Sequence, residues 1–249
     1  MTITTIKKRK GRKTSPSIVI LIDHIHNKLI NDYPISLAQF NKNYFIDIQI
    51  SSIRTIFDES SEIILCCGFS ADTIADHVKK KYRGQNIKIV ENKLYEEKSG
   101  VEGLRLCLNN INNESLLVVD GHLLIYPEIF SKFDPINFVM LQKKEFVNLE
   151  VGLIKDGNNT ITNLSYGLPD KWAEIFHVNN YEDMEKLRAT CSMENAGNKM
   201  LFEILNESGI KFTSIDNEFP LVKIIDSKTK NKVKRIYEST DTGLFVKFI

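Results

Sequence analysis

The stretch that decides the fold reads Glu62-Ile63-Ile64-Leu65-Cys66-Cys67-Gly68-Phe69-Ser70-Ala71-Asp72-Thr73-Ile74. It begins with a short continuous apolar run, which is typical of a strand buried on both faces of a parallel sheet. Gly68 ends this run, and Ser70 is a residue type that caps helices. Apolar residues then recur at helical spacing as far as Tyr82. The stretch therefore predicts a strand followed directly by a helix that packs on the sheet.

The same order of strand and helix repeats through the first half of the chain. Apolar runs at 18–22, 87–90 and 116–119 predict further buried strands, and helical spacing predicts helices near 46–57 and 101–111. In the second half, strands are expected at 138–141, 151–155, 160–164, 210–215, 221–225 and 244–248, and helices at 181–189, at 194–208 and after 226. We therefore predict an α/β fold with a mainly parallel, doubly wound sheet and mixed strands in the second half.

The charge of the chain is unevenly distributed. Six of the 33 basic residues lie in Lys7-Lys8-Arg9-Lys10-Gly11-Arg12-Lys13. The remainder has 27 basic residues against 32 acidic ones, which argues against a globally basic nucleic-acid binder. We expect residues 1–15 to form a disordered basic arm that could contact nucleic acid through its phosphates, and residues 16–249 to form a single domain. No apolar run approaches the ~18 residues of a membrane span.

The cysteine pattern gives no sign of a zinc site or a disulfide framework. The four cysteines are Cys66, Cys67, Cys107 and Cys191, and none of them forms a C-x-x-C pair. Two of them are adjacent within an apolar run. This pattern fits a protein of a reducing compartment, so a cytoplasmic location is expected.

Polar residues follow three of the predicted strands. The first strand runs into Asp23-His24-Ile25-His26-Asn27-Lys28, the fourth into Asp120-Gly121-His122, and the strand at 221–225 into Asp226. Open parallel sheets bind ligands at the carboxyl ends of their strands. Asp120 and His122 are two residues apart, so on an extended chain both side chains point the same way and could share a metal ion. The alternative is that these residues form an ordinary turn, and that His24 and His26 lie in an ordinary loop.

The order of these elements resembles the nucleotidyltransferases of the sugar-phosphate and choline-phosphate type, which have a GT-A-like fold. The segment 62–74 is similar to the family's second strand, which ends in Gly-Tyr and opens a helix. The segment 86–95 resembles the next strand and the Asn-x-x-Tyr that follows it. Asp120-Gly121-His122 stands where the family ends a strand in Gly-Asp, and 222–226 stands where it has Trp-x-Glu-Ile-Asp. The resemblance covers roughly residues 17–238.

This resemblance implies an activity and a set of site residues. The family transfers a nucleotidyl group from a nucleoside triphosphate to a phosphorylated sugar or alcohol, releases pyrophosphate and uses a divalent metal ion, Mg²⁺ or Mn²⁺. Carried over to this chain, the catalytic residues would be Lys28, Asp120 and Asp226, and the metal ligands Asp120, His122 and Asp226. The nucleotide would contact Ile22, Asp23, His24, His26, Asn27, Lys28 and Gly68. The acceptor pocket is expected near Glu150, Trp172 and Glu174.

The sequence departs from the family at the positions that handle phosphate. The family's first loop reads Leu-Ala-Ala-Gly-x-Gly-Ser/Thr-Arg-Leu, and here His24 and His26 replace the glycines while Lys28 replaces the arginine. The Pro-Lys motif reads Pro34-Ile35, and the aspartate of Gly-Asp falls on His122. Loop amides, cationic side chains and metal ions do nearly all the work in nucleotidyl transfer, so losing one such group commonly costs ~10²–10³ in rate.

Three functions follow as hypotheses. The first is a divergent nucleotidyltransferase, in which Asp120 supplies the missing carboxylate and Lys28 the missing cation. The second is a catalytically inactive scaffold of the same fold that binds a nucleotide or a partner. The third is a GT-A glycosyltransferase, which would use Asp120-Gly121-His122 as a D-x-H metal motif and hold a nucleotide-sugar through Mn²⁺.

Overall fold

The computed structural model describes residues 15–23, 34–98, 100–131, 133–143, 146–147, 149–219 and 221–238. The basic arm at 7–13, the loop residues 24–33 and the strand expected at 244–248 lie outside the described residues. No helix in the described ranges is both long enough and apolar enough to cross a membrane.

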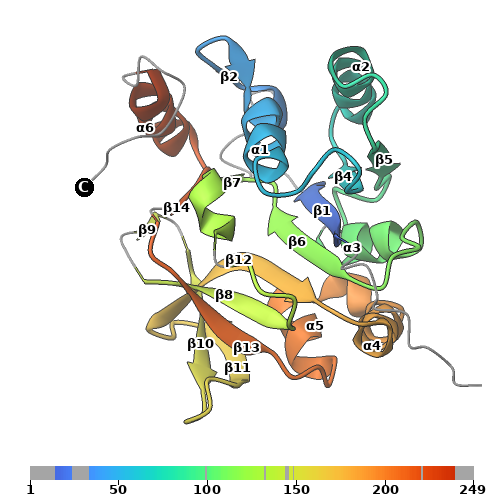
Figure 1. Ribbon diagram of the computed structural model, residues 1–249, viewed down its shortest axis with the longest axis vertical. Helices are drawn as coiled ribbons and strands as arrows, with labels where there is room; N and C mark the ends of the chain where they lie inside the picture. The colour runs from blue at the N-terminus through green and yellow to red at the C-terminus, as the bar shows by residue number, and fades with distance from the viewer. Residues whose placement is uncertain are drawn as a thin grey trace, which may run out of the picture.

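The first half of the chain forms four parallel strands in the order β6-β1-β4-β5 (Figure 1). These strands are β1 (Ser17–Ile22), β4 (Ile63–Cys67), β5 (Ile87–Glu91) and β6 (Leu116–Asp120). The helices α1 (Phe45–Arg54), α2 (Ala71–Lys81) and α3 (Val101–Leu108) connect them. Ser70 stands at the start of α2 as predicted. Its backbone is left-handed, and its side chain makes no hydrogen bond that caps the helix. The predicted doubly wound parallel sheet is confirmed.

The second half continues the same sheet with antiparallel strands. The strand β12 (Asp170–Val178) is antiparallel to β6, β8 (Phe138–Gln142) and β10 (Val151–Lys155). At the edges, β11 (Ile161–Tyr166) pairs with β10, and β13 (Thr213–Asn217) is parallel to β8. No pattern in the sequence predicts β12, the strand that joins both halves. The mixed strands predicted for this half are confirmed.

Two expectations for the second half were wrong in detail. The helix expected at 194–208 is divided into a short 3-10 turn, Ala196–Asn198, and α5 (Leu201–Glu207). Lys199 has an extended backbone between them, so one continuous helix cannot form. The strand expected at 221–225 is the shorter β14 (Leu221–Lys223), and it lies outside the main sheet between β7 (Leu123–Leu124) and β9 (Phe146–Val147). The remaining elements are the 3-10 turns Ile35–Leu37 and Pro127–Phe130, strands β2 (Gln39–Phe40) and β3 (Asn43–Tyr44), and helices α4 (Tyr181–Cys191) and α6 (Ser227–Glu238).

The main sheet has a separate apolar core on each face. Alternate residues of β1 point to opposite faces, as the geometry of a strand requires. Ile18 and Ile20 pack in the core under α1 and α2, whereas Val19 and Leu21 pack in the core under α3 and α4. Because β1 is buried on both faces, it has to be apolar at every position, which explains why its sequence shows no alternation.

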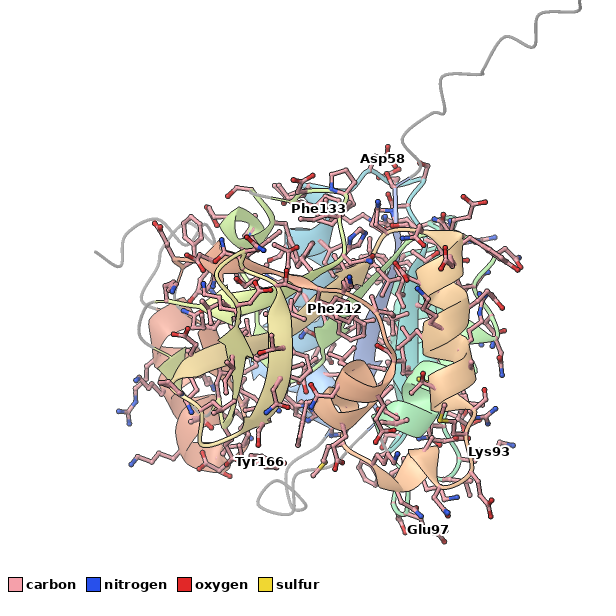
Figure 2. The ribbon with its side chains drawn as sticks, turned by 90° about the horizontal axis from the view of Figure 1, so that it is seen from below. Asp58, Lys93, Glu97, Phe133, Tyr166 and Phe212 are labelled. Atoms are coloured by element: carbon pink, nitrogen blue, oxygen red, sulfur yellow. The ribbon has the colours of Figure 1, made fainter. Side chains whose placement is uncertain are left out.

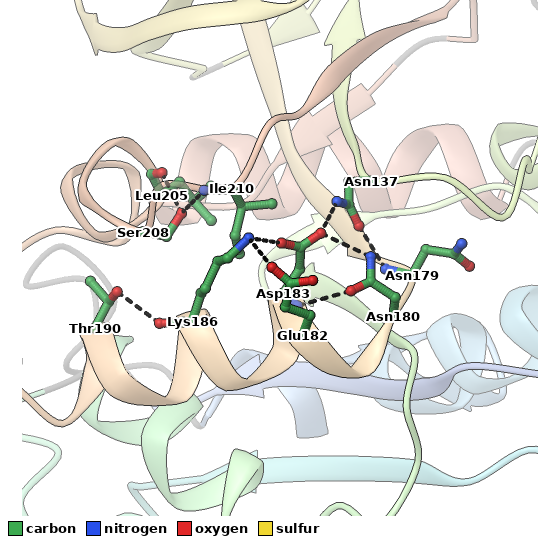
Figure 3. A network of polar contacts seen from close by, with 10 residues as sticks. All are labelled: Asn137, Asn179, Asn180, Glu182, Asp183, Lys186, Thr190, Leu205, Ser208 and Ile210. Atoms are coloured by element: carbon green, nitrogen blue, oxygen red, sulfur yellow. Dashed lines mark hydrogen bonds and ion pairs between the residues drawn. The ribbon is translucent and has the colours of Figure 1, made fainter.

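A polar network fixes the start of α4 to the sheet (Figure 3). The Asn180 side chain accepts a hydrogen bond from the backbone N–H of Asp183, and this is a helix cap. The Asp183 carboxylate accepts bonds from Asn180 and from Asn137, which precedes β8, and it also pairs with Lys186. Burial alone would raise the pKa of Asp183, but these partners together hold that pKa below its ordinary value. The network thereby ties the end of β12 and the start of β8 to one helix terminus.

The parallel strands begin at one side of the sheet, which we call its amino edge, and end at the opposite side, its carboxyl edge (Figure 2). Asp58 precedes β4 and lies at the amino edge, where Phe133 is also found. Lys93 and Glu97 follow β5 and lie at the opposite, carboxyl edge. Asp23 directly follows β1 and Asp120 ends β6, so these two predicted site residues lie at this carboxyl edge.

His177 in β12 is packed inside the molecule, as its neighbours in the sequence suggest. Its Nδ1 donates to the Ile136 carbonyl at 2.6 Å, so its Nε2 accepts from the Ser115 hydroxyl at 2.8 Å. The ring also packs against Phe133 and Phe138. Burial lowers the pKa of His177 to about 4. Protonation therefore opposes folding at this position.

We expect this histidine to make the protein less stable in mild acid. The unfolded chain takes up a proton near pH 6.5 and the folded chain only near pH 4, so stability is complete above pH 6.5 and is lost as the pH falls toward 4. From pH 7 to pH 5 this group alone should lower the free energy of unfolding by about 2 kcal/mol. Urea unfolding at pH 7 and at pH 5 measures this change in the free energy of unfolding. The control is His177→Gln, which lacks the titrating ring. An equal pH dependence in the two proteins would refute this prediction.

Gly121 lets the end of β6 lie against β1. Its N–H donates to the Leu21 carbonyl at 2.7 Å. A Cβ at this position would be 1.9 Å from the Ile22 Cγ2 and 2.5 Å from the Leu21 oxygen. Real Cβ atoms do not approach other atoms so closely, so only glycine fits here.

Replacing this glycine should destabilise the fold strongly. Gly121→Ala forces β6 away from β1, and we expect the free energy of unfolding to fall by about 3 kcal/mol. The control is Gly157→Ala in the turn between β10 and β11, where a Cβ would meet nothing within 4 Å. Its effect should stay below about 0.5 kcal/mol. Chemical denaturation of both variants tests the comparison, and similar losses would show that the close approach of β6 to β1 is not the cause.

Candidate functional site

The residue that follows β1 is buried and makes hydrogen bonds inside the protein. Asp23 follows β1 and is fully buried. Its carboxylate accepts a hydrogen bond from the Asn92 side chain at 2.8 Å and one from the Gly100 N–H at 3.2 Å. Burial raises the pKa of Asp23, and these two donors partly offset that rise. The Asp23 side chain therefore anchors the loop after β5 and points into the protein interior.

The other predicted nucleotide-binding residues fall into two groups. Ile22 is nearly buried, and a Cβ at Gly68 would be 2.4 Å from the Asp23 carbonyl oxygen. The structure thus brings Ile22, Asp23 and Gly68 together at one point of the carboxyl edge. His24, His26, Asn27 and Lys28 lie outside the described residues, so their roles stay predictions.

Helix α1 holds the turn that follows β6. The Gln49 side-chain amide donates to the backbone carbonyls of Gly121 and Leu123, at 3.1 and 2.9 Å. Within the turn, the His122 N–H donates to the Asp120 Oδ1 at 2.7 Å. The Asp120 carboxylate is thereby fixed at the end of β6 by a local bond, while Gln49 satisfies the buried carbonyls beside it.

Asp120 meets a lysine and a second acidic side chain at this edge. The Lys223 Nζ lies 3.4 Å from the Asp120 Oδ2 and 2.5 Å from the Glu174 Oε2. The side chains of Lys223, Asp120 and Glu174 are only 12%, 15% and 14% exposed. We call these three residues the charged cluster. They come from β14, β6 and β12, so the cluster joins elements far apart in the sequence.

Glu174 reaches the cluster because β12 is irregular at this point. The pairing of β12 with β8 shifts register between Trp172 and Phe176. Glu174 has a φ of 56°, in the left-handed region that residues other than glycine seldom adopt. The Trp172 indole N–H donates to the Ile175 carbonyl at 3.1 Å and closes the irregular turn of the strand. Such strained positions gather at functional sites, where the surrounding structure enforces them.

The acidity of the cluster follows from burial and mutual charge. Burial and the neighbouring Asp120 carboxyl raise the pKa of Glu174 to about 8, although Lys223 opposes the rise. Burial alone would lower the pKa of Lys223, but the charges of Asp120 and Glu174 outweigh it and raise that pKa above its ordinary value. Lys223 is therefore a firmly protonated cation between two carboxyl groups.

The donor set does not fit the metal site predicted from the sequence. Asp226 accepts bonds from the backbone N–H and the hydroxyl of Thr229, at 2.7 and 2.6 Å, and so caps α6. The His122 Nδ1 is 3.4 Å from the Asp120 Oδ1. Across the ranges that the structure describes, no three His, Cys, Asp or Glu side chains gather into a set that could hold a metal ion. The metal role of Asp120, His122 and Asp226 stays a prediction, and we derive no chemical step from it.

Only part of this site is predicted from the sequence. Asp120 was predicted, and Glu174 was expected near the acceptor, but Lys223 was not singled out. One signal was available, since Lys223 is a cation inside the short apolar run Leu221-Val222-Lys223-Ile224-Ile225. Charged residues are almost never buried unless they are paired, so a lysine at this position predicts an acidic partner.

The strained backbone at Glu174 can be tested with two substitutions that remove the same carboxylate. Because glycine adopts a positive φ without steric cost, Glu174→Gly should be more stable than Glu174→Ala by about 1 kcal/mol. At Ala173, the preceding residue of β12, the order should reverse, and Ala173→Gly should cost about 1 kcal/mol. Urea unfolding of the variants measures both differences. If Glu174→Ala is as stable as Glu174→Gly, the strain is absent in solution.

Comparison with known proteins gives a structural likeness only. No protein-family model matches this sequence, and no curated protein matches it. Among solved structures, the CTP:phosphocholine cytidylyltransferase of Streptococcus pneumoniae has 16% identity and a TM-score of 0.68 over 89% of this chain and 98% of its own. The inositol-1-phosphate CTP transferase of T. maritima has 13% identity and a TM-score of 0.72 over 92% and 98%. A UDP-glucose pyrophosphorylase complexed with UDP-glucose has 9% identity and a TM-score of 0.69 over 91% and 99%. The chain therefore has the fold that these nucleotidyltransferases share.

Proposed function

We propose that this protein binds a nucleoside triphosphate at the carboxyl edge of its sheet and transfers the nucleotidyl group to a phosphorylated sugar or alcohol, with release of pyrophosphate. The observation that carries the proposal is the charged cluster of Asp120, Glu174 and Lys223 at the edge where parallel sheets bind ligands. The printed names of the similar structures, a cytidylyltransferase, a CTP transferase and a pyrophosphorylase, support the same class of reaction.

The chemistry of the reaction assigns a task to the cluster. An oxygen of the acceptor phosphate attacks the α-phosphorus in line with the leaving pyrophosphate, and negative charge builds up on the phosphoryl oxygens. A fixed cation in a site with little water stabilises this charge without reorganising during the reaction. Lys223 is such a cation, because Glu174 and Asp120 hold its ammonium group. We assign contact with the triphosphate to the predicted residue Lys28.

A second candidate function is nucleotide binding without transfer. Two observations favour it. Lys223 already neutralises the carboxylates of the cluster, and Asp226 caps α6 through Thr229. A protein of this kind would bind the nucleotide as a ligand and would leave it chemically unchanged. The two candidates differ in one measurable product, pyrophosphate.

Binding and product release together separate the candidates. Thermal unfolding is followed with CTP, UTP, ATP, dTTP, GTP and UDP-glucose, each with Mg²⁺, Mn²⁺ or EDTA. Pyrophosphate is then measured with the nucleotide that binds and with phosphocholine or glucose 1-phosphate as acceptor. We expect a shift of the unfolding temperature and release of pyrophosphate, and Asp120→Asn should slow that release about 10²–10³-fold. Lys143→Gln, which removes an exposed lysine 3.8 Å from Asp216, is the control that should change neither result.

Each other outcome points to a different conclusion. A shift with a nucleoside triphosphate but no release of pyrophosphate favours the second candidate over the first. A shift that requires Mn²⁺ and UDP-glucose, again without pyrophosphate, favours the glycosyltransferase hypothesis. If no nucleotide shifts the unfolding temperature, the proposal fails.

A further inference from the structure

The charged cluster contains two carboxyl groups of the kind that divalent metal ions bind in proteins. Mg²⁺ and Mn²⁺ take carboxylate oxygens at little more than 2 Å and favour sites that bring two acidic side chains together. Asp120 and Glu174 are such a pair, and each is largely withdrawn from water. Any negative charge on this buried pair requires a cation close by, since buried carboxylates are stable only when they are paired.

Lys223 supplies that cation from within the chain. Its Nζ is 2.5 Å from the Glu174 Oε2 and 3.4 Å from the Asp120 Oδ2, so one ammonium group contacts both carboxylates. A divalent ion at the same carboxylates would lie within a few ångströms of this ammonium group. At such a distance, and with side chains that are 12–15% exposed, solvent screens the repulsion only weakly. The lysine and a metal ion therefore compete for one place.

The backbone holds all three side chains in this arrangement. Lys223 lies on β14, which is paired with β7 through Leu123, and the next residue, Ile224, donates its N–H to the His122 carbonyl at 2.9 Å. Glu174 is held by the irregular turn of β12, and Asp120 by the N–H of His122. An exposed ion pair between two flexible side chains has no such support. The cluster is thus built into the fold from three separate elements.

We infer that Lys223 is a built-in cation that takes the place of a divalent metal ion between Asp120 and Glu174. This inference rests on the proposed function, because it states how the phosphates bound at this edge meet positive charge. It also accounts for the disagreement between these side chains and the metal site that the fold suggests.

Titration with Mn²⁺ alone, followed by electron paramagnetic resonance, tests the inference without any nucleotide. We expect Lys223→Gln to bind Mn²⁺ at least about tenfold more tightly than the unsubstituted protein, because metal affinity rises with the negative charge of the ligands. The gain should disappear in the double variant Lys223→Gln, Asp120→Asn. Lys143→Gln removes a lysine of similar charge from an exposed pair and should leave Mn²⁺ binding unchanged.

The result that overturns the inference is equally clear. Tight Mn²⁺ binding to the unsubstituted protein that is lost in Asp120→Asn would mean that the metal and Lys223 do not compete. Equal affinities of the Lys223→Gln variant and the unsubstituted protein would mean the same.

Folding is checked by circular dichroism, because Lys223→Gln leaves two buried carboxylates without their cation. If that variant does not fold alone, it is refolded with Mn²⁺ present, and Mn²⁺ should then raise its unfolding temperature more than that of the unsubstituted protein. The titration of the unsubstituted protein and of Asp120→Asn decides the question in either case. Since the probe is the metal alone, failure of every nucleotide in the binding screen refutes the proposed function and leaves this readout intact.

Discussion

The contact of the Lys223 ammonium group with Asp120 and Glu174 is the interaction on which the arrangement of this molecule depends. Asp120 ends β6 in the parallel half of the main sheet, Glu174 lies in β12 of the antiparallel half, and Lys223 comes from the small sheet beside them. One cation therefore links three parts of the structure. Removing one member of a buried ion pair commonly costs 3–5 kcal/mol, roughly, because the remaining charge is left without a partner in a medium that solvates it poorly.

The sequence predicted the parallel half well because a single physical constraint acts there. Strands covered by helices on both faces must be apolar throughout, and the run 63–67 followed by Gly68 and a helical stripe meets that constraint locally. The strand β12 was missed because its residues include Lys171, Glu174 and His177, which look polar in sequence and find partners only in the folded chain. The charged cluster was missed for the same reason. Its members are about 50 residues or more apart, so no spacing in the sequence joins them.

The glycines near the end of β1 have a role in packing that differs from the role of glycines in a phosphate-binding loop. The resemblance aligns His24 and His26 with two glycines of a phosphate-binding loop, where glycine lets backbone amides approach the ligand. Gly68, Gly103 and Gly121 surround the end of β1 instead, where a Cβ would come within 2.5 Å of Asp23, Leu21 or Ile22. These glycines let a strand, a helix and a loop pack closely around the end of β1.

Stability alone does not explain why three charged side chains lie at the carboxyl edge. Replacing a buried ion pair by apolar residues of similar size is often neutral or even stabilising, so folding stability alone does not account for the choice of charged residues there. Glu174 also holds a left-handed backbone conformation that costs of order 1–3 kcal/mol. The cluster thus combines a desolvation cost with a strained backbone at the edge where sheets of this type bind ligands. Such a combination is typical of positions where function, and not folding stability, keeps the charged side chains.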